Sequence, residues 1–390
     1  MYYKELAGET VSALGMGCMR LPKINGERDK IDWTKAQEII DYAMLHGINY
    51  FDTGYRYHAG ESERFIGESL KRYPRGSFLL ASKFPGHMVK KKSGGLLEFT
   101  SLLTGHPDST VDLIFREQLQ KCQVDYFDFY LLHDVSEHSL RFYNDPEIQV
   151  VEYVKNQKEL GRIRHLGLST HALSASTIDD FLTKYEGVFE FVQIQLNYLD
   201  WTLQDARSKL AVAKRHGLKV VVMEGVRGGR LASLPDAQMK KLQALRKEDS
   251  AARWALRWLQ SLPEVAVILS GMSSLNQVVE NIETFYVHNP VNKEEKALLS
   301  EVARSLLDLV PCTACRYCTE GCPMKLDIPN IILAYNGVKN GDYIARYHPD
   351  EVGPNLDPRR CSACETCTSI CPQNIAIPNI MSDFTKTLMK

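Results

Sequence analysis

The chain has 390 residues, of which 44% are hydrophobic and 24% are charged, and these proportions are typical of a folded globular protein. Its length exceeds one ordinary hydrophobic core and predicts two domains, one of them large. The formal net charge is −1, so the composition gives no electrostatic reason to expect nucleic acid or an anionic membrane as a partner.

The amino-terminal sequence MYYKELAGETVSALGMG has no basic segment followed by a long apolar run, so we do not expect a signal peptide. No segment approaches the ~20 consecutive apolar residues that span a bilayer. We therefore expect a cytoplasmic protein.

Short apolar runs alternate with amphipathic stretches through the first 290 residues. Strands are predicted at 13–16, 50–52, 78–83, 127–133, 165–169, 191–195, 219–223 and 265–269. Helices are predicted at 33–46, 61–73, 109–123, 150–161, 175–185, 204–216, 248–261 and 275–285. This alternation implies parallel strands with helical crossovers, and the length fits an α/β fold of the (β/α)₈ TIM-barrel type. A doubly wound sheet is disfavoured because no G-x-G-x-x-G follows the first strand.

The chain pattern changes near residue 290, where Asn289-Pro290 breaks the alternation. A helix is predicted over 293–309, ahead of Pro311 and a group of cysteines. We therefore expect a barrel domain over 1–290, a linker helix over 291–310 and a second, small domain over 311–390.

Eight of the ten cysteines lie in the last 79 positions. They form two runs with the spacing C-x₂-C-x₂-C-x₃-C-P, and the members are Cys312, Cys315, Cys318 and Cys322, then Cys361, Cys364, Cys367 and Cys371. In a reducing cytosol such a cluster indicates metal rather than disulfides. The spacing is that of bacterial ferredoxins with two clusters, in which the fourth cysteine of each run ligates the other cluster.

This pattern predicts two [4Fe–4S] clusters. One takes Cys371 as its remote ligand beside the first three cysteines of the first run, and the other takes Cys322 beside the first three of the second run. A pair of structural zinc sites is the alternative, but zinc is usually held by two C-x₂-C pairs. Predicted helices over 328–336 and 342–347 make the small domain resemble the mainly α-helical dicluster ferredoxins.

Polar side chains end three successive predicted strands. Asp52 ends the second, Lys83 the third and His133 the fourth, while Tyr57 lies just beyond the second. The carboxyl ends of barrel strands meet on one face, so these side chains are expected to converge there. The long connections 86–107 and 134–146 follow strand ends and belong to the same face.

These residues resemble the aldo-keto reductase family over about residues 1–290. DTGYRY at 52–57 resembles the family's D-[TS]-A-x-x-Y, and Lys83 and His133 match the rest of its catalytic tetrad. The segments GRIRHLGLS (161–169), QIQLN (193–197) and GMSSLNQ (271–277) are similar to further family motifs. The resemblance implies an NADP- or NAD-dependent oxidoreductase that binds its nucleotide without a Rossmann fold.

The resemblance also implies which residues hold the nucleotide. Those expected near the nicotinamide are Ser169, Thr170, Gln193 and Met223, and those expected near the adenosine end are Gly271, Ser273, Gln277 and Asn281. Thr170 replaces the family's Asn, and Met223 replaces an aromatic residue. Gly271 and Gln277 stand where Lys and Arg often grip a 2′-phosphate, so NADP and NAD both stay open. Arg227 and Arg230, in the preceding loop, are candidates for that grip.

The implied reaction interconverts a small carbonyl and an alcohol. Tyr57 would donate the proton, Lys83 would lower the pKa of that phenol, Asp52 would fix Lys83, and His133 would orient the carbonyl oxygen. Cys18, His58 and His171 lie near the predicted rim, where a plain structural role is equally open.

The clusters pose a separate question, because nicotinamide moves two electrons as a hydride whereas an iron–sulfur cluster moves one. They could relay electrons to a redox partner protein or stabilise the fold. The alternative function is a nucleotide-binding redox sensor or electron-transfer module without carbonyl turnover. Specificity is expected in the loops 86–107, 134–146 and 226–237.

Overall fold

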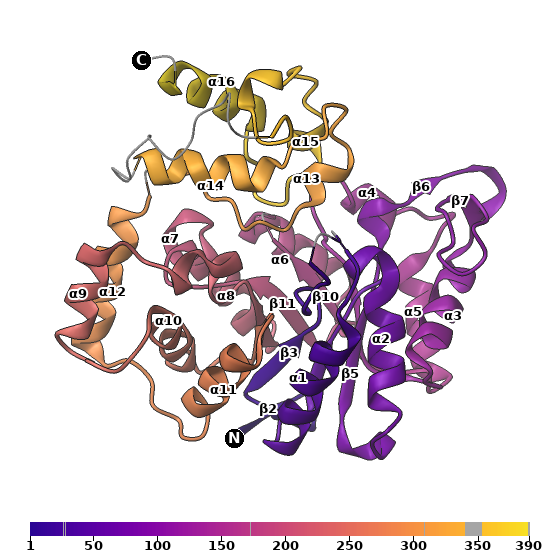
Figure 1. Ribbon diagram of the computed structural model, residues 1–390. Helices are drawn as coiled ribbons and strands as arrows, with labels where there is room; N and C mark the ends of the chain where they lie inside the picture. The colour runs from indigo at the N-terminus through magenta and orange to yellow at the C-terminus, as the bar shows by residue number, and fades with distance from the viewer. Residues whose placement is uncertain (26, 28, 172, 308, 340–352, 389–390) are drawn as a thin grey trace. The chain divides into compact units, whose positions relative to one another are not determined.

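The structure is a computed structural model that describes all residues except 26, 28, 172, 308, 340–352 and 389–390 (Figure 1). The predicted helix over 342–347 therefore lies outside the described residues. The described chain forms two compact units, one over 1–196, 200–225 and 256–291, and the other over 197–199, 226–255 and 292–390.

The first unit contains a closed barrel of eight parallel strands, as predicted. In chain order they are β3 (Leu14–Gly17), β4 (Tyr50–Asp52), β5 (Leu79–Phe84), β9 (Phe127–Leu132), β10 (Ile163–Thr170), β11 (Phe191–Gln195), β12 (Lys219–Met223) and β13 (Val265–Ser270). The last strand pairs with the first, with Ile268 opposite Leu14. This closure excludes the doubly wound alternative, which leaves two open edges.

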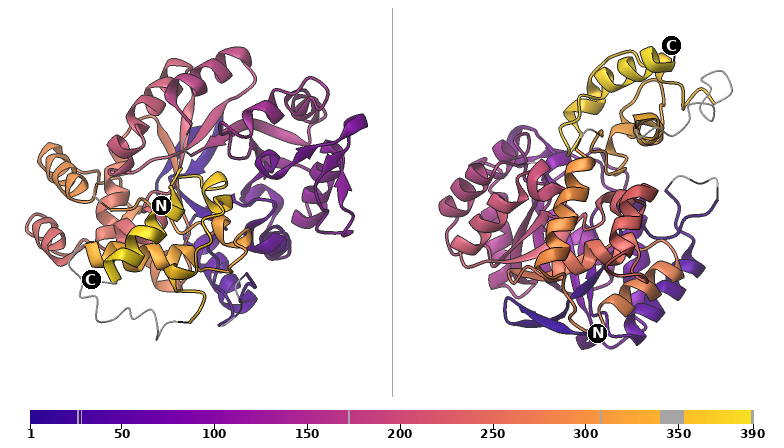
Figure 2. Two further views of the ribbon diagram at one scale, coloured as in Figure 1. Left: turned by 90° about the horizontal axis from the view of Figure 1, so that it is seen from above. Right: turned by 90° about the vertical axis from the view of Figure 1, so that its left-hand side faces the viewer.

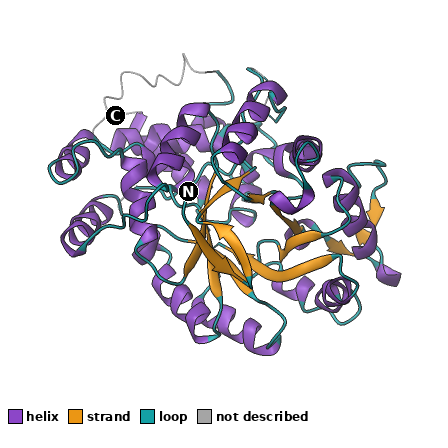
Figure 3. Ribbon diagram, turned by 90° about the horizontal axis from the view of Figure 1, so that it is seen from below, coloured by secondary structure: helices purple, strands orange, loops and turns teal. Residues whose placement is uncertain are grey.

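Helices surround the strands (Figure 3). They are α1 (Trp33–Leu45), α2 (Glu61–Leu70), α3 (Val111–Cys122), α5 (Val150–Glu159), α6 (Ala175–Lys184), α8 (Ala206–Arg215), α10 (Ala251–Gln260) and α11 (Leu275–Thr284). Because helices cover the strands outside and side chains fill the barrel inside, β5, β9 and β13 are buried at every position. This explains why their sequences read as apolar runs without alternation.

Several of these helices begin at side-chain caps that the sequence supplies. Asp32, Thr110 and Ser174 each accept a hydrogen bond from the backbone amide three residues later. Such caps satisfy amide groups that the first helical turn leaves unpaired. They fix where each crossover helix starts after its βα loop.

A two-stranded hairpin, β1 (Tyr3–Leu6) and β2 (Glu9–Ser12), precedes the barrel and lies beside the amino terminus (Figure 2). Leu6 and Val11 are fully buried among side chains from the amino-terminal ends of barrel strands, including Tyr50, Leu79 and Phe191. The hairpin therefore closes the bottom of the barrel, and the opposite face is left for the site.

The long connections have structure of their own. The first holds a short 3₁₀ helix, η3 (Gly86–Met88), and a small sheet of β6 (Lys90–Lys91), β7 (Leu97–Glu98) and β8 (Asp108–Ser109). The second holds α4 (Leu140–Tyr143). The Tyr143 hydroxyl donates to the carbonyls of His133 (2.7 Å) and Phe84 (3.0 Å), which ties this loop to the ends of β5 and β9.

The second unit takes in 226–255 and 197–199 beside 292–390. Residues 226–255 include α9 (Asp236–Gln243), which lies against α12 (Lys293–Ser305). Charges join the two segments: the Arg246 guanidinium contacts the Glu295 carboxylate at 2.6 Å, and Lys241 contacts Glu301 at 2.5 Å. A single cut in sequence cannot show such pairing between distant segments.

The cysteine region of the second unit is mainly helical. Its elements are α13 (Tyr317–Glu320), α14 (Ile328–Lys339), η7 (Pro358–Arg360), α15 (Thr366–Ser369) and α16 (Ile377–Leu388). Ile331, Tyr335, Met381 and Phe384 form a small core between α14 and α16, together with the buried side chains of Cys318 and Cys367. Among the described residues, no helix is long and apolar enough to cross a membrane.

Candidate active site and cysteine sites

The four predicted tetrad residues come together at the carboxyl ends of the first strands. Asp52 is the last residue of β4, Lys83 lies near the end of β5, and His133 directly follows β9. Tyr57 begins η1 (Tyr57–Gly60), and its amide donates to the Gly54 carbonyl at 3.1 Å. A Cβ at Gly54 would lie 3.2 Å from the phenol ring, so glycine lets Tyr57 fold back against the end of β4.

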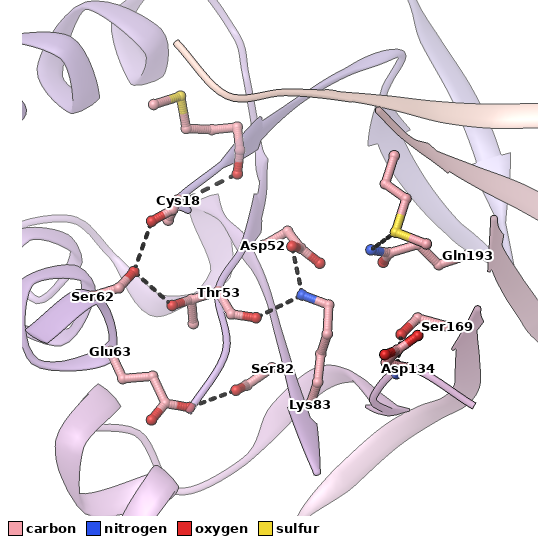
Figure 4. A network of polar contacts seen from close by, with 12 residues as sticks. Cys18, Asp52, Thr53, Ser62, Glu63, Ser82, Lys83, Asp134, Ser169 and Gln193 are labelled. Carbon is pink, nitrogen blue, oxygen red and sulfur yellow. Dashed lines mark hydrogen bonds and ion pairs between the residues drawn. The ribbon is translucent and has the colours of Figure 1, made fainter. Parts of the chain in front are cut away.

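Lys83 is fully buried and held at both sides by oxygen atoms (Figure 4). Its Nζ donates to the Asp52 carboxylate at 2.6 Å and to the Thr53 carbonyl at 2.7 Å. Burial raises the pKa of Asp52, whereas the Lys83 charge opposes that rise. The ammonium is therefore fixed at one point in the barrel mouth.

The Tyr57 ring faces both Lys83 and His133. The Lys83 Nζ lies 5.0 Å from the ring centroid, and the Tyr57 and His133 rings meet edge to face with centroids 5.8 Å apart. Burial raises the pKa of Tyr57 well above 10, and Asp52 adds to the rise. A lowered pKa is expected from Lys83, but the pKa of Tyr57 is raised here because burial disfavours phenolate and the Asp52 charge adds to the rise.

His133 is buried, and burial lowers its pKa well below 6.5, with His87 adding to the fall. The His87 ring meets it edge to face at 4.6 Å between centroids. His133 is thus a neutral imidazole that can donate one hydrogen bond to a carbonyl oxygen.

These two pKa shifts predict the pH dependence of turnover. Between pH 6.5 and 10, Tyr57 keeps its proton and His133 stays neutral, so kcat for a reaction in which Tyr57 donates its proton should show no titration step. The reverse reaction needs Tyr57 to accept a proton, so its rate should rise with pH over the same range. Steady-state rates in both directions check this, and an inflection near pH 7 in the direction that uses Tyr57 as an acid would contradict it.

A second buried ion pair is linked by hydrogen bonds to the backbone of Lys83. Glu63 contacts Lys121 at 2.5 Å, and both side chains are fully buried. Glu63 also accepts from Ser82 (2.6 Å) and Gln118 (2.7 Å), and Gln118 in turn donates to the Lys83 carbonyl at 3.0 Å. This network holds the backbone that carries Lys83.

Replacing Lys121 by methionine should lower the free energy of unfolding by about 3–5 kcal/mol, because it leaves the Glu63 carboxylate buried without its cation. The matched control is Lys71→Met, since Lys71 contacts Glu68 at 2.6 Å in a pair that is about half exposed. That change should cost about 1 kcal/mol or less. Equal losses in chemical denaturation would show that burial of the first pair does not matter.

Of the three rim residues, His58 has a structural role. Its Nε2 accepts from the Leu21 amide at 3.2 Å, and burial lowers its pKa to about 4. The His171 Nδ1 lies 3.0 Å from the Gln195 side chain. Cys18 is fully buried, and its amide donates to the Asp52 carbonyl at 2.8 Å, so it lies beside the tetrad.

Two of the residues expected near a nicotinamide, Ser169 and Gln193, lie across the barrel mouth from Lys83 (Figure 4). Ser169 and Gln193 are opposite each other on β10 and β11, and the Gln193 Nε2 lies 3.7 Å from the Met223 sulfur. Two buried oxygens, Thr170 Oγ1 and Gln193 Oε1, have no hydrogen-bond partner among the described residues. Because buried polar atoms normally bond, these two fit a carboxamide group supplied by a ligand.

The residues expected near adenosine lie at the start of α11. The Ser273 hydroxyl donates to the Arg20 carbonyl at 2.8 Å, and its amide donates to Gln277 Oε1 at 2.7 Å. Asn281 is buried and donates to Ser270 at 3.0 Å, so its amide is already engaged with β13. Gly271, Ser273 and Gln277 are exposed at a helix amino terminus, which favours anions such as phosphate.

The eight cysteines of the second unit line two separate cavities. Four members of one set surround the first, and these are Cys312, Cys315, Cys318 and Cys371. The other four surround the second, and these are Cys322, Cys361, Cys364 and Cys367. Each set thus takes three cysteines from one run and the fourth from the other. Burial raises the pKa of Cys371, and the Arg227 charge opposes that rise.

A model of the aldo/keto reductase family matches residues 13–304, which is most of the chain. The chain belongs to the aldo/keto reductase family. A model of a 4Fe-4S dicluster domain matches residues 311–376. The protein is therefore an aldo/keto reductase-type oxidoreductase fused to an iron–sulfur domain, as the sequence motifs predict.

Relatives of this aldo/keto reductase come from bacteria, plants and fungi. The uncharacterized oxidoreductase YqkF of Bacillus subtilis is 24% identical over 319 residues, covering 76% of this chain and 94% of that protein. The NADH-specific methylglyoxal reductase of Escherichia coli is 24% identical and covers 76% and 96%. The solved structure of aldo-keto reductase AKR11C1 from Bacillus halodurans, in its holo form, has a TM-score of 0.59, 26% identity and coverage of 77% and 96%.

The structure adds site residues that sequence reasoning missed in this aldo/keto reductase. His87 and Asp134 lie beside His133, and Arg20 lies beside Gly271 and Ser273. Each follows the end of a barrel strand closely, so position alone could have selected it.

Two residues predicted for the nucleotide instead belong to the second unit. Arg230 donates to the carbonyls of Leu306 (2.8 Å) and Val310 (3.3 Å). Arg227 is fully buried and donates to the Pro311 carbonyl and to Gln373. Sequence proximity to β12 suggested a phosphate grip, whereas their guanidinium groups are engaged with the segment that leads into the cysteines.

Proposed function

We propose that this protein interconverts a small carbonyl and its alcohol by hydride transfer from or to NADP or NAD, with Tyr57 as proton donor. The observation that carries the proposal is the Lys83 ammonium, fixed by Asp52 at 2.6 Å and facing a Tyr57 ring that also meets His133. A lone tyrosine after a strand usually has only a packing role. A phenol, an ammonium, a carboxylate and an imidazole together in one buried site are instead suited to proton transfer.

Each residue has one task in the proposed reduction. His133 donates a hydrogen bond to the carbonyl oxygen and polarises it, because its imidazole is neutral. Tyr57 transfers its phenolic proton to that oxygen as negative charge develops there. Lys83 then stabilises the phenolate, and Asp52 keeps the ammonium in place. A nicotinamide dinucleotide, when bound, supplies the hydride that reaches the carbonyl carbon.

The nucleotide site is proposed from the residues that fit it. Thr170 Oγ1 and Gln193 Oε1 are the unpartnered oxygens suited to the carboxamide, with Ser169 beside them and Met223 at the ring position. Gly271, Ser273, Gln277 and, less directly, Asn281 would serve the adenosine end. The name of the E. coli relative, a methylglyoxal reductase that is NADH-specific, supports a small carbonyl as substrate.

The second unit is proposed to bind two [4Fe–4S] clusters. Each cavity is lined by four thiols, and thiolates are the usual ligands of such clusters. Cluster ligation needs cysteines that do not form disulfides, and the reducing cytoplasm is the compartment that keeps thiols in this state. When bound, each cluster carries one electron, which suits exchange with a redox partner protein. Residues 1–290 would act as the catalytic domain and 311–390 as the cluster domain.

An anaerobic assay of the cluster-loaded protein tests the proposal. Oxidation of NADH and NADPH is followed with a panel of small aldehydes and ketones, and the alcohol product is identified. We expect carbonyl-dependent oxidation that is lost in Tyr57→Phe. Turnover that needs a one-electron acceptor and survives this change would favour a sensor or electron-transfer module instead.

A further inference from the structure

The loop that follows β12 carries a buried arginine, Arg227, whose side chain contacts segments next to the cysteines. Arg227 is fully buried, with one guanidinium nitrogen donating to the Pro311 carbonyl and another donating to Gln373 Oε1 at 3.0 Å. Pro311 directly precedes Cys312, and Gln373 follows Cys371 by two positions. The guanidinium therefore bridges the two separate segments that supply one thiol set.

The backbone of this loop is shaped for the approach. Arg227 has φ of +50° and Gly228 of +65°, which are left-handed conformations that most residues avoid. A Cβ at Gly228 would lie 1.9 Å from the Thr313 carbonyl oxygen, so only glycine permits this contact. Strained backbone of this kind persists where the surroundings hold it in place.

The two cysteine runs differ at the residue whose side chain accepts a hydrogen bond from Arg227. The first run continues Cys322-Pro323-Met324, whereas the second continues Cys371-Pro372-Gln373. Beyond its cysteines, the cavity of Cys322 is lined mainly by apolar residues, and these are Met324, Leu326, Ile328, Ile377, Pro378 and Met381. Gln373 lines the cavity of Cys371 instead. The Arg227 guanidinium therefore contacts a residue that lines the cavity of Cys371.

A positive charge at this point has a definite physical effect. A cluster held by four thiolates gains negative charge on reduction, and a nearby fixed cation stabilises the reduced form more than the oxidised form. The guanidinium donates to the Pro311 carbonyl and to Gln373, one position before Cys312 and two positions after Cys371, so its charge lies next to this thiol set. Because Arg227 itself is fully buried, solvent screens its charge less than it screens an exposed one.

We propose that Arg227 is a positioning residue that raises the reduction potential of the cluster held by Cys312, Cys315, Cys318 and Cys371. This inference rests on the proposed cluster ligation. It makes the two clusters unequal, because the guanidinium contacts Pro311 and Gln373, which lie next to members of this set.

The test is a redox titration of the full-length protein, followed by electron paramagnetic resonance. In Arg227→Gln, one of the two midpoint potentials should move to a lower value and the other should stay at its wild-type value. Arg227→Lys keeps the charge, so its midpoint should lie closer to wild type than that of the glutamine variant. Titrating Arg227→Gln in a Cys361→Ser background, which lacks the other cluster, assigns the shifted midpoint.

Arg230→Gln is the matched control, because it removes the same charge from the same loop at a side chain that donates to the Leu306 and Val310 carbonyls. Its midpoints should stay near wild type. Two intact clusters with unmoved midpoints in Arg227→Gln, or equal shifts in both arginine variants, would overturn the role of Arg227. A chain without iron and acid-labile sulfide would overturn the cluster ligation as well.

Discussion

Tyr57→Phe should lower kcat for carbonyl reduction by about 10²–10⁴-fold, which is the usual contribution of a positioned general acid. The change removes one hydroxyl and keeps the ring that lies 5.0 Å from Lys83 Nζ. Affinity for the nucleotide should stay near wild type, because Ser169 and Gln193 lie on other strands. Stopped-flow measurement of nucleotide binding and hydride transfer separates the two quantities.

Tyr55→Phe is the matched control for this change. Tyr55 is fully buried two residues earlier, and its hydroxyl accepts a hydrogen bond from the Leu102 amide at 3.1 Å. Losing that bond should cost about 1 kcal/mol of stability with little effect on kcat. If Tyr55→Phe abolished turnover and Tyr57→Phe did not, the proton donor would be assigned wrongly.

Removal of iron should unfold the cysteine region and leave the barrel folded. The small core between α14 and α16 includes cysteines among its members, and these cysteines also line the two cavities. A region of this size depends on its metal for stability. After anaerobic chelation, amides of α14 and α16 should lose protection from hydrogen exchange, whereas β9 and β13 should keep theirs.

Substitution of the fourth cysteine of each run tests the two clusters one at a time. Each cavity takes its fourth thiol from the other run. Cys371→Ser should therefore remove the cluster whose other ligands begin at Cys312, and Cys322→Ser should remove the cluster whose other ligands begin at Cys361. Cys122→Ser, at a buried cysteine of α3, should leave both clusters in place. Full protection of α14 and α16 in the iron-free protein would show that the clusters have no structural role.

The barrel strands were predictable because their chemistry is local. β4, β11 and β12 have the predicted bounds, since each is an apolar run that ends at a polar residue or a turn. The tetrad positions were predictable for the same reason, because strand ends define one face. The predicted barrel helices run one to several residues too long, for example 61–73 against Glu61–Leu70, where no sequence signal marks the last turn. The helix predicted over 328–336 is instead too short, because α14 extends to Lys339.

Other features depend on contacts between distant segments, which no local pattern encodes. Residues 226–255 belong to the second unit through ion pairs such as Arg246 with Glu295, and Arg227 contacts Gln373, 146 positions away. The raised pKa of Tyr57 depends on its burial and on the neighbourhood of Asp52, Cys18 and Asp134. Such surroundings become visible only once the chain has folded.

Deuterium tracing tests the central claim most directly. The cluster-loaded protein reduces a carbonyl with NADH or NADPH that carries deuterium at the transferred position of the nicotinamide ring, in ordinary water. Direct hydride transfer beside Tyr57 predicts one deuterium on the alcohol carbon, and Tyr57→Phe should form this labelled product far more slowly. Solvent hydrogen on that carbon, formed at a rate that depends on the clusters, would show that the electrons travel singly through the iron–sulfur domain.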